Sequence, residues 1–174
     1  MVEQLSIDRG KTAVLIIDYQ MRQFSNFSPE RQKEILKTAN EVLARTRSAG
    51  IPVIYVEVVR GERTPETAIN PSILPKPGEP VLTKSRVGPF STTNLDELCK
   101  KQGINTLVLM GINTSGCVLS TVRWGADIDY KLIVLSDCCH DPDTEIQRVL
   151  IEKLFPRQGS VIDSRQFFKL LEKA

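Results

Sequence analysis

Three residues of the sequence, Asp18, Lys84 and Cys117, combine the groups needed to hydrolyse an acyl compound. Each follows or ends a short apolar run, so the three side chains are expected at the ends of strands. A thiol becomes a nucleophile when it loses its proton, and its pKa falls beside a cation or at the start of a helix. Asp18 could take that proton as general base and return it to a leaving amine as general acid. These residue types therefore indicate acyl transfer through a thioester, followed by attack of water.

Each of the three also has an ordinary structural interpretation. An aspartate after a strand often caps a turn, an isolated lysine is usually solvated, and a lone cysteine is most often small apolar filling in a core. What favours chemistry is their coincidence at three strand ends. The carboxyl ends of parallel strands meet at one edge of a sheet, so side chains at these ends converge.

Short β-branched runs alternate with segments of helical periodicity, which predicts a parallel sheet with helices on both faces. The predicted strands are residues 12–18, 51–59, 81–84, 106–111, 131–137 and 159–164. The predicted helices are residues 28–50, 94–103, a helix that begins near Cys117, 143–155 and 164–173. We expect a single α/β domain, residues 1–174, with a doubly wound, Rossmann-like three-layer αβα architecture. Its six-stranded parallel sheet should have the order 3-2-1-4-5-6.

In an open parallel sheet, ligands bind beyond the carboxyl ends of the strands, where the strand order reverses. The expected order places the first and fourth strands side by side at this reversal. Asp18 and Cys117 would face each other across the crevice, and Lys84 would enter from one side. The turn before the cysteine, "GINTSGC", holds glycines and small side chains, so backbone N–H groups could gather there to stabilise an oxyanion.

The sequence resembles the isochorismatase-like hydrolase family, the cysteine hydrolases related to nicotinamidase and N-carbamoylsarcosine amidase. The resemblance is carried by "AVLIIDYQ", "LTKSRVGPFSTTNLDELCKKQGINTLVLMGINTSGCVLSTVRWGAD" and "YKLIVLSDCC". The family pattern around the cysteine matches Gly111, Ile112, Thr114, Cys117, Val118, Thr121 and Arg123. The resemblance implies that Asp18, Lys84 and Cys117 form a catalytic triad.

The same resemblance implies a cis peptide bond between Ile112 and Asn113. This bond directs the backbone N–H groups of Asn113 and Cys117 into an oxyanion hole. The resemblance also implies a homo-oligomer, a dimer or a tetramer.

The sequence departs from the nicotinamidases of this family, which bind a metal through an aspartate and histidines on the loop after the second strand. The corresponding loop here, "VRGERTPETAINP", contains no histidine, and the one histidine of the chain, His140, follows the fifth strand. No metal and no other cofactor is therefore expected. The "SDCCHDPD" stretch, with Cys138, Cys139 and His140, is a poor zinc site because adjacent cysteines rarely bind one ion together. We interpret it as a turn near a subunit interface or the pocket rim, with His140 an alternative base for Cys117.

Four further residues are candidates for contact with a substrate: Tyr19, Phe24, Arg86 and Phe90. Arg86 could clamp an anionic group or pair with a neighbouring carboxylate, and the aromatic rings could wall a pocket or belong to the core. Ser91 and Thr92 replace a small-residue turn of the family, so this pocket wall is expected to differ. The proline-rich loop from Pro65 to Pro80 is a candidate lid or partner contact.

The composition gives no case for nucleic acid or an anionic membrane as partner, because 23 basic residues nearly balance 21 acidic ones. The N-terminal stretch "MVEQLSIDRGK" lacks the apolar region of a signal peptide, and no apolar run is long enough to cross a bilayer. Four cysteines without a C-x-x-C pair are typical of free thiols in a reducing compartment. We therefore expect a cytoplasmic protein.

The leading hypothesis is a metal-independent cysteine hydrolase that cleaves an amide-like C–N bond of a small molecule: a carboxamide, a ureido compound or a lactam. True isochorismatases cleave a vinyl ether and need no cysteine at this position, so Cys117 favours C–N hydrolysis. Two alternatives stay open. One is vinyl ether hydrolysis with Asp18 as the acid, and the other is a catalytically silent binding or scaffold member of the fold.

Overall fold

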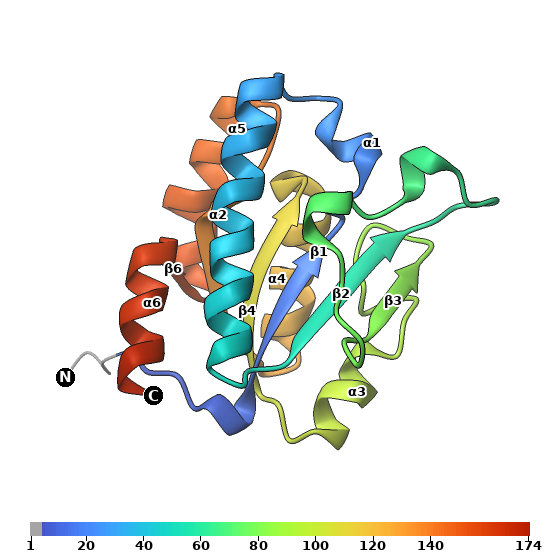
Figure 1. The fold of residues 1–174 in the computed structure, drawn as a ribbon. Coiled ribbons are helices and arrows are strands. Elements are labelled where there is room, and N and C mark those ends of the chain that lie inside the picture. The colour runs from blue at the N-terminus through green and yellow to red at the C-terminus, as the bar shows by residue number, and fades with distance from the viewer. Residues whose placement is uncertain (1–4) are drawn as a thin grey trace.

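The computed structural model describes residues 5–174 and contains a six-stranded sheet in which all neighbouring strands run parallel (Figure 1). The strand order is β3-β2-β1-β4-β5-β6, which confirms the predicted order. The strands are β1 Thr12–Ile17, β2 Val53–Val58, β3 Val81–Lys84, β4 Thr106–Ile112, β5 Lys131–His140 and β6 Ser160–Ile162. The central pair, β1 and β4, is buried along its whole length because both strands have near-continuous apolar sequences.

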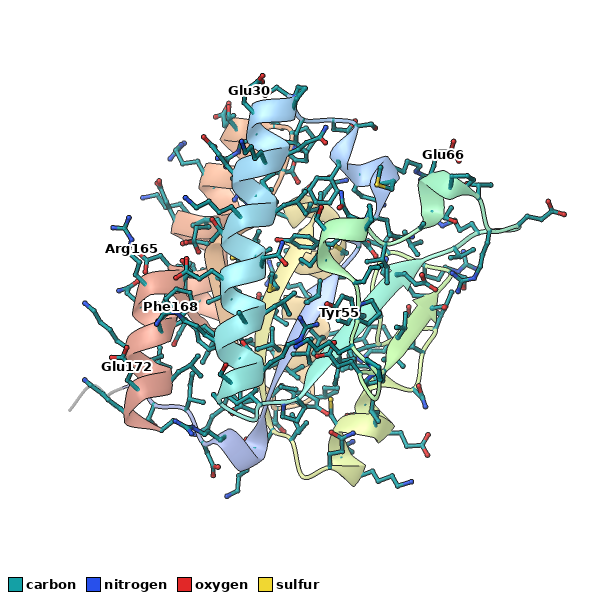
Figure 2. All side chains as sticks on the ribbon, viewed as in Figure 1. Glu30, Tyr55, Glu66, Arg165, Phe168 and Glu172 are labelled. Atoms are coloured by element: carbon teal, nitrogen blue, oxygen red, sulfur yellow. The ribbon has the colours of Figure 1, made fainter. Side chains whose placement is uncertain are left out.

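Helices cover both faces of this sheet, as the alternating pattern predicts (Figure 1). The helices are α1 Met21–Phe24, α2 Pro29–Ser48, α3 Leu95–Lys101, α4 Leu119–Asp127, α5 Thr144–Val149 and α6 Ser164–Lys173. One apolar core lies under α2 and α6, where Tyr55 of β2 and Phe168 of α6 are labelled in Figure 2. A second core lies under α3, α4 and the segment after α5. The sheet therefore separates an α2 side from an α4 side.

The long helix α2 begins and ends where its sequence predicts. The Ser28 hydroxyl accepts a hydrogen bond from the Arg31 backbone N–H, and Pro29 occupies the first helical position. Gly50, just beyond the last turn, has a φ of 70°, a left-handed conformation that glycine adopts without steric cost.

Several boundaries differ from the prediction, and three of these differences affect the carboxyl edge of the sheet where the site residues lie. β1 ends at Ile17, and Asp18 has a φ of 57°, in the left-handed region that aspartate tolerates better than most residues. β5 continues to His140, because its pairing with β4 resumes after an irregularity. The helix expected at Cys117 starts with a π-helical turn, Thr114–Val118, before α4 begins.

Other differences are smaller. The helix predicted over 143–155 divides into α5, a π-helical turn at Leu150–Leu154 and a 3-10 turn at Phe155–Arg157, where the proline removes a backbone donor. The short helix α1 was not predicted. Residues 1–4, part of the N-terminal stretch and of the expected 1–174 domain, lie outside the described residues. Within residues 5–174, no helix is both long and apolar enough to cross a membrane.

The proline-rich loop is fixed to the domain at several places. Ile69 pairs with Gln20 in an isolated antiparallel bridge, and the Ile73 side chain is buried. Glu79 forms a two-bonded ion pair with Arg47 near the end of α2, with 2.7 Å for each N–O distance. A lid movement of the whole loop would break these contacts, and its role as a lid or a partner contact stays a prediction.

Candidate active site

Asp18 and Lys84 form an ion pair at the carboxyl edge of the sheet, with 2.8 Å between Lys84 Nζ and Asp18 Oδ2. Asp18 directly follows β1 and Lys84 is the last residue of β3, so the pair spans the end of β2. β2 holds both residues in place: the Asp18 N–H donates to the Val56 carbonyl, and Lys84 is in register with Val58. The two side chains are 6% and 2% exposed, so each charge depends on the other for compensation.

Cys117 lies in the π-helical turn between β4 and α4, and its side chain is buried. The thiol donates a hydrogen bond to the Asn113 carbonyl oxygen, with 3.4 Å between Sγ and O. It also lies close enough to the Asp18 carboxylate for each group to shift the pKa of the other. The structure therefore brings Asp18, Lys84 and Cys117 together.

Gly111 permits this close approach. A Cβ at Gly111 would stand 2.7 Å from Val118 Cγ2 and 3.2 Å from the carbonyl oxygen of Ile17. Any larger residue would push the turn away from the end of β1. Because Ile17 immediately precedes Asp18, the absence of a side chain at Gly111 helps to set the distance between the thiol and the carboxylate.

Burial is the largest influence on the protonation of both reactive groups. Burial raises the pKa of the Asp18 carboxyl, and Lys84, the Cys117 thiol and the Arg60 charge act in the opposite direction. Burial also raises the pKa of the Cys117 thiol well above its usual range, and the Asp18 carboxylate raises it further, whereas Lys84 lowers it. The expectation of a lowered thiol pKa is therefore wrong. The thiol keeps its proton, and Asp18 Oδ1 accepts no hydrogen bond from the described residues, so it is available as an acceptor.

The turn before Cys117 is held by hydrogen bonds within it and from β5. The Ile112–Asn113 peptide bond is cis, and the Asn113 carbonyl accepts from the N–H groups of Gly116 (3.2 Å) and Val118 (3.5 Å). Asp141, one residue beyond β5, accepts from both the backbone N–H and the hydroxyl of Ser115, at 2.8 and 2.6 Å. Sequence reasoning missed this support, because Asp141 lies in the "SDCCHDPD" stretch, in which no pattern indicates a contact with Ser115.

Arg60 is a second residue that sequence reasoning missed. It follows β2, its Nε donates to the Ser85 carbonyl oxygen at 3.1 Å, and its charge lowers the pKa of Asp18. Arg86 lies in the adjoining segment, where its carbonyl oxygen accepts from Lys84 Nζ at 3.3 Å and its side chain is exposed. Arg60 directly follows the predicted strand 51–59, and this position could have indicated that it belongs to the site.

The aromatic candidates have mainly packing roles. Tyr19 and Phe24 are both about 1% exposed, pack edge to face in the core on the α2 side, and the Tyr19 hydroxyl donates to the Cys138 carbonyl at 2.7 Å. Of the two interpretations, the structure therefore favours the core for these two rings, and their contact with a substrate stays a prediction. Phe90 is buried on the α4 side and stacks on the half-exposed ring of Trp124.

His140 lies at the end of β5, with its ring against Phe27 and its Nδ1 3.4 Å from an Arg31 nitrogen. These contacts are on the α2 side, and the carboxylate near the Cys117 thiol belongs to Asp18. The structure therefore favours Asp18 over His140 as the base. Among residues 5–174, no three His, Cys, Asp or Glu side chains gather in a way that could hold a metal ion.

Comparison with known proteins identifies the family. Residues 12–166 match the model of the isochorismatase domain. This match covers most of the chain, and the protein belongs to the isochorismatase family of hydrolases. The resemblance deduced from the sequence motifs is thereby confirmed.

Curated relatives align over much of the chain. The ureidoacrylate amidohydrolase RutB of Pantoea ananatis is 28% identical over 209 residues, which covers 95% of this chain and 80% of that protein. The secreted isochorismatase effector Isc1 of Verticillium dahliae is 30% identical over 139 residues, 72% of this chain and 73% of that protein.

Solved structures show the same fold. An isochorismatase family protein from Burkholderia thailandensis superimposes with a TM-score of 0.86 at 26% identity, over 96% of this chain and 98% of the other. N-carbamoylsarcosine amidase from Thermoplasma acidophilum superimposes with a TM-score of 0.77 at 23% identity, over 88% of this chain and 96% of the other.

Proposed function

We propose that this protein is a cysteine hydrolase that cleaves an amide-like C–N bond of a small molecule: a carboxamide, a ureido compound or a lactam. The observation that carries the proposal is the buried Asp18–Lys84 pair with the Cys117 thiol beside it. RutB, a relative over most of the chain, is an amidohydrolase of ureidoacrylate, and its name supports a C–N bond as the target. The loop after β2 contains no histidine, which favours a mechanism without a metal.

The first half-reaction forms a thioester. Asp18 takes the proton of the Cys117 thiol as the sulfur attacks the carbonyl carbon, and a C–S bond forms. The Lys84 ammonium compensates the buried negative charge, whether the Asp18 carboxylate or the Cys117 thiolate carries it. The backbone N–H groups of Asn113 and Cys117 receive the oxyanion. The C–N bond then breaks as Asp18 returns the proton to the leaving nitrogen.

The second half-reaction frees the acid. Asp18 takes a proton from a water molecule, whose oxygen attacks the thioester carbonyl. The C–S bond breaks, and the thiolate of Cys117 recovers the proton from Asp18. Because Asp18 accepts and donates a proton in each half-reaction, a carboxyl with a raised pKa suits the role better than a fully ionised surface carboxylate.

A screen of small amides, ureas and lactams with the wild type and the C117A variant tests this proposal. Turnover should appear with the wild type and fall by about 10³-fold or more in C117A, because the nucleophile is lost. Circular dichroism and thermal unfolding check that C117A is folded. Turnover of an amide or urea that survives in folded C117A would contradict a cysteine hydrolase.

Vinyl ether hydrolysis is the second candidate, and one observation favours it: burial raises the pKa of the Asp18 carboxyl, which makes this group more suited to donate a proton than an exposed carboxyl. In that reaction Asp18 would protonate the enol ether carbon, and Cys117 would have no covalent role. If this candidate is right, wild type and C117A should cleave an isochorismate-like vinyl ether equally well. If only the cysteine hydrolase proposal is right, neither protein should cleave it.

A further inference from the structure

Two exposed arginines lie beside the buried Asp18–Lys84 pair. Arg60 is the second residue after β2 and Arg86 is the second residue after β3, so both follow neighbouring strands at the carboxyl edge of the sheet (Figure 1). The Val59 N–H donates to the Lys84 carbonyl oxygen at 3.1 Å, and this bond holds the segment after β2 against the end of β3. The proposed mechanism gives neither arginine a role.

The guanidinium of Arg60 is fixed at one nitrogen and free at the other two. Its Nε donates to the carbonyl oxygen of Ser85, the residue directly after Lys84, at 3.1 Å. Burial raises the pKa of the Asp18 carboxyl, and the Arg60 charge, like that of Lys84, acts against this rise, so the guanidinium lies within electrostatic range of the catalytic carboxyl. The terminal nitrogens of Arg60 have no hydrogen-bond or ion-pair partner among residues 5–174. Arg60 therefore has donors to spare beside the reacting groups.

The charges around the site do not balance. Lys84 is neutralised by its buried ion pair, and Arg63, further along the loop after β2, is paired with Glu57. Arg60 and Arg86, by contrast, have no carboxylate partner in the part of the chain that the structure describes. Two positive charges thus remain beside a pair whose own charges cancel. The resulting field attracts an anion to this edge of the sheet.

The segment from Ser85 to Phe90 connects Arg60 with the nucleophile. Arg60 is bound to the first residue of this segment. Val87, near its middle, lies over the nucleophile turn, because a Cβ at Gly116 would stand 3.9 Å from Val87 Cγ1. Gly116 directly precedes Cys117. The same short segment therefore borders both the guanidinium and the thiol, so one small ligand can contact the two groups together.

We propose that Arg60 is a specificity-determining residue, which selects at the Cys117 site acyl compounds that carry a carboxylate a few atoms from the carbonyl carbon. The terminal nitrogens of the guanidinium donate to that carboxylate, in the paired geometry that arginine favours, while the Cys117 sulfur attacks the carbonyl carbon. Arg86 adds a second positive charge to the same region. The choice of an acyl compound rests on the cysteine hydrolase proposal, whereas the preference for an anion can be measured without turnover.

Iodoacetate and iodoacetamide test this preference. Both transfer a substituted methylene group to the Cys117 thiolate with loss of iodide, and they differ in carrying a carboxylate or a neutral amide. The quantity to measure is the rate constant for iodoacetate divided by that for iodoacetamide at Cys117, followed by peptide mass spectrometry. A change in the thiol pKa or in access to the thiol affects both reagents and cancels in this ratio.

R60Q should lower the ratio by about fivefold, the upper end of what an exposed ion pair contributes. High ionic strength should lower the wild-type ratio toward that of R60Q, because salt screens the attraction. R60K keeps the positive charge and should have a higher ratio than R60Q. A merely structural role of Arg60 at Ser85 would change the two rate constants alike and leave the ratio unaltered.

R165Q is the matched control, because it removes the same charge from an exposed position on α6. Figure 2 labels Arg165 on the opposite side of the molecule from Glu66, which belongs to the loop after β2. R165Q should leave the ratio unchanged. The proposal is overturned if R60Q has the wild-type ratio, if R165Q lowers the ratio as much as R60Q does, or if R60K has no higher ratio than R60Q.

The alkylation experiment and the C117A screen fail separately. A lowered ratio in R60Q supports anion selection by Arg60 even where no amide, urea or lactam is turned over, a result that would contradict the hydrolase proposal alone. Turnover that depends on Cys117, together with an unchanged ratio in R60Q, would support the hydrolase proposal and overturn the role of Arg60.

Discussion

Lys84 and Asp18 connect the outermost strand β3 to the central strand β1 through a buried ion pair that spans the end of β2. Neither strand could supply this arrangement alone, because Asp18 leaves β1 with a left-handed backbone conformation and Lys84 reaches it from two strands away. The pair stabilises the fold, and its two charges also shift the pKa of the Cys117 thiol. Its two functions can be measured separately.

Replacing Lys84 by methionine should destabilise the protein, because the Asp18 carboxylate would lose its buried partner. We expect the free energy of unfolding in urea to fall by about 3 kcal/mol or more. Lys100 and Asp96 form an exposed pair on α3, with 68% and 37% exposed side chains, and K100M should cost about 0.5 kcal/mol at most. Equal losses for the two variants would show that the buried pair has no special role in stability.

The Asp18→Asn variant should lower the pKa of the Cys117 thiol while it abolishes turnover. In the wild type the carboxylate raises the thiol pKa, so its removal leaves Lys84 to stabilise the thiolate, and the thiolate fraction at a given pH rises. The pH profile of iodoacetamide alkylation at Cys117, followed by peptide mass spectrometry, should therefore move to lower pH. Cys99, whose pKa burial raises to about 11, is an internal control that should not change. A profile that moves to higher pH would contradict this account of the site.

Asp141→Asn should slow catalysis more than it destabilises the fold. Asp141 holds the Ser115 N–H and hydroxyl, and a small displacement of the turn misplaces the nucleophile, so kcat should fall by about tenfold. Asp143, two residues further on, caps α5 through the N–H groups of Glu145 and Ile146. D143A should cost about 1 kcal/mol of stability and leave kcat unchanged. An unchanged kcat in D141N would show that Asp141 does not position the turn for catalysis.

Gly111→Ala should destabilise the junction of β4 with the nucleophile turn. The added methyl group would meet Val118 Cγ2 at 2.7 Å and the Ile17 backbone oxygen at 3.2 Å, so we expect a loss of about 1–3 kcal/mol. Gly10 is a matched control, because a Cβ there has its nearest contact at 3.5 Å from Asp8 Oδ1. G10A should change the free energy of unfolding by about 0.5 kcal/mol at most. Thermal and urea unfolding of the two variants give the comparison.

The sheet could be predicted because each strand has its own apolar run, and short crossover connections leave few alternatives to the observed order. The convergence of Asp18, Lys84 and Cys117 followed from that order. The protonation of the thiol could not be predicted in the same way. It depends on how completely Cys117 is buried and on how close its thiol lies to the Asp18 carboxylate. The sequence indicates that the two residues are neighbours but does not give the distance between them.

The supporting residues were also beyond sequence reasoning, for a related reason. Asp141 reaches Ser115 only because β5 continues to His140 after an irregularity in its pairing with β4, and no local pattern indicates that extension. Tyr19 and Phe24 follow β1 as pocket residues could, yet their rings turn into the core on the α2 side. Strand ends can be placed from sequence, whereas the face toward which the next few side chains point depends on the backbone after the strand.

The nucleophile can be identified by intact-protein mass spectrometry of acid-quenched mixtures of the enzyme with an amide, ureido compound or lactam that it turns over. In the wild type we expect an adduct with the mass of the acyl group on Cys117, located by peptide mapping and released by hydroxylamine. C117A should form no adduct. Full turnover without any acyl adduct, together with undiminished turnover by C117A, would contradict the proposal that Cys117 is the nucleophile.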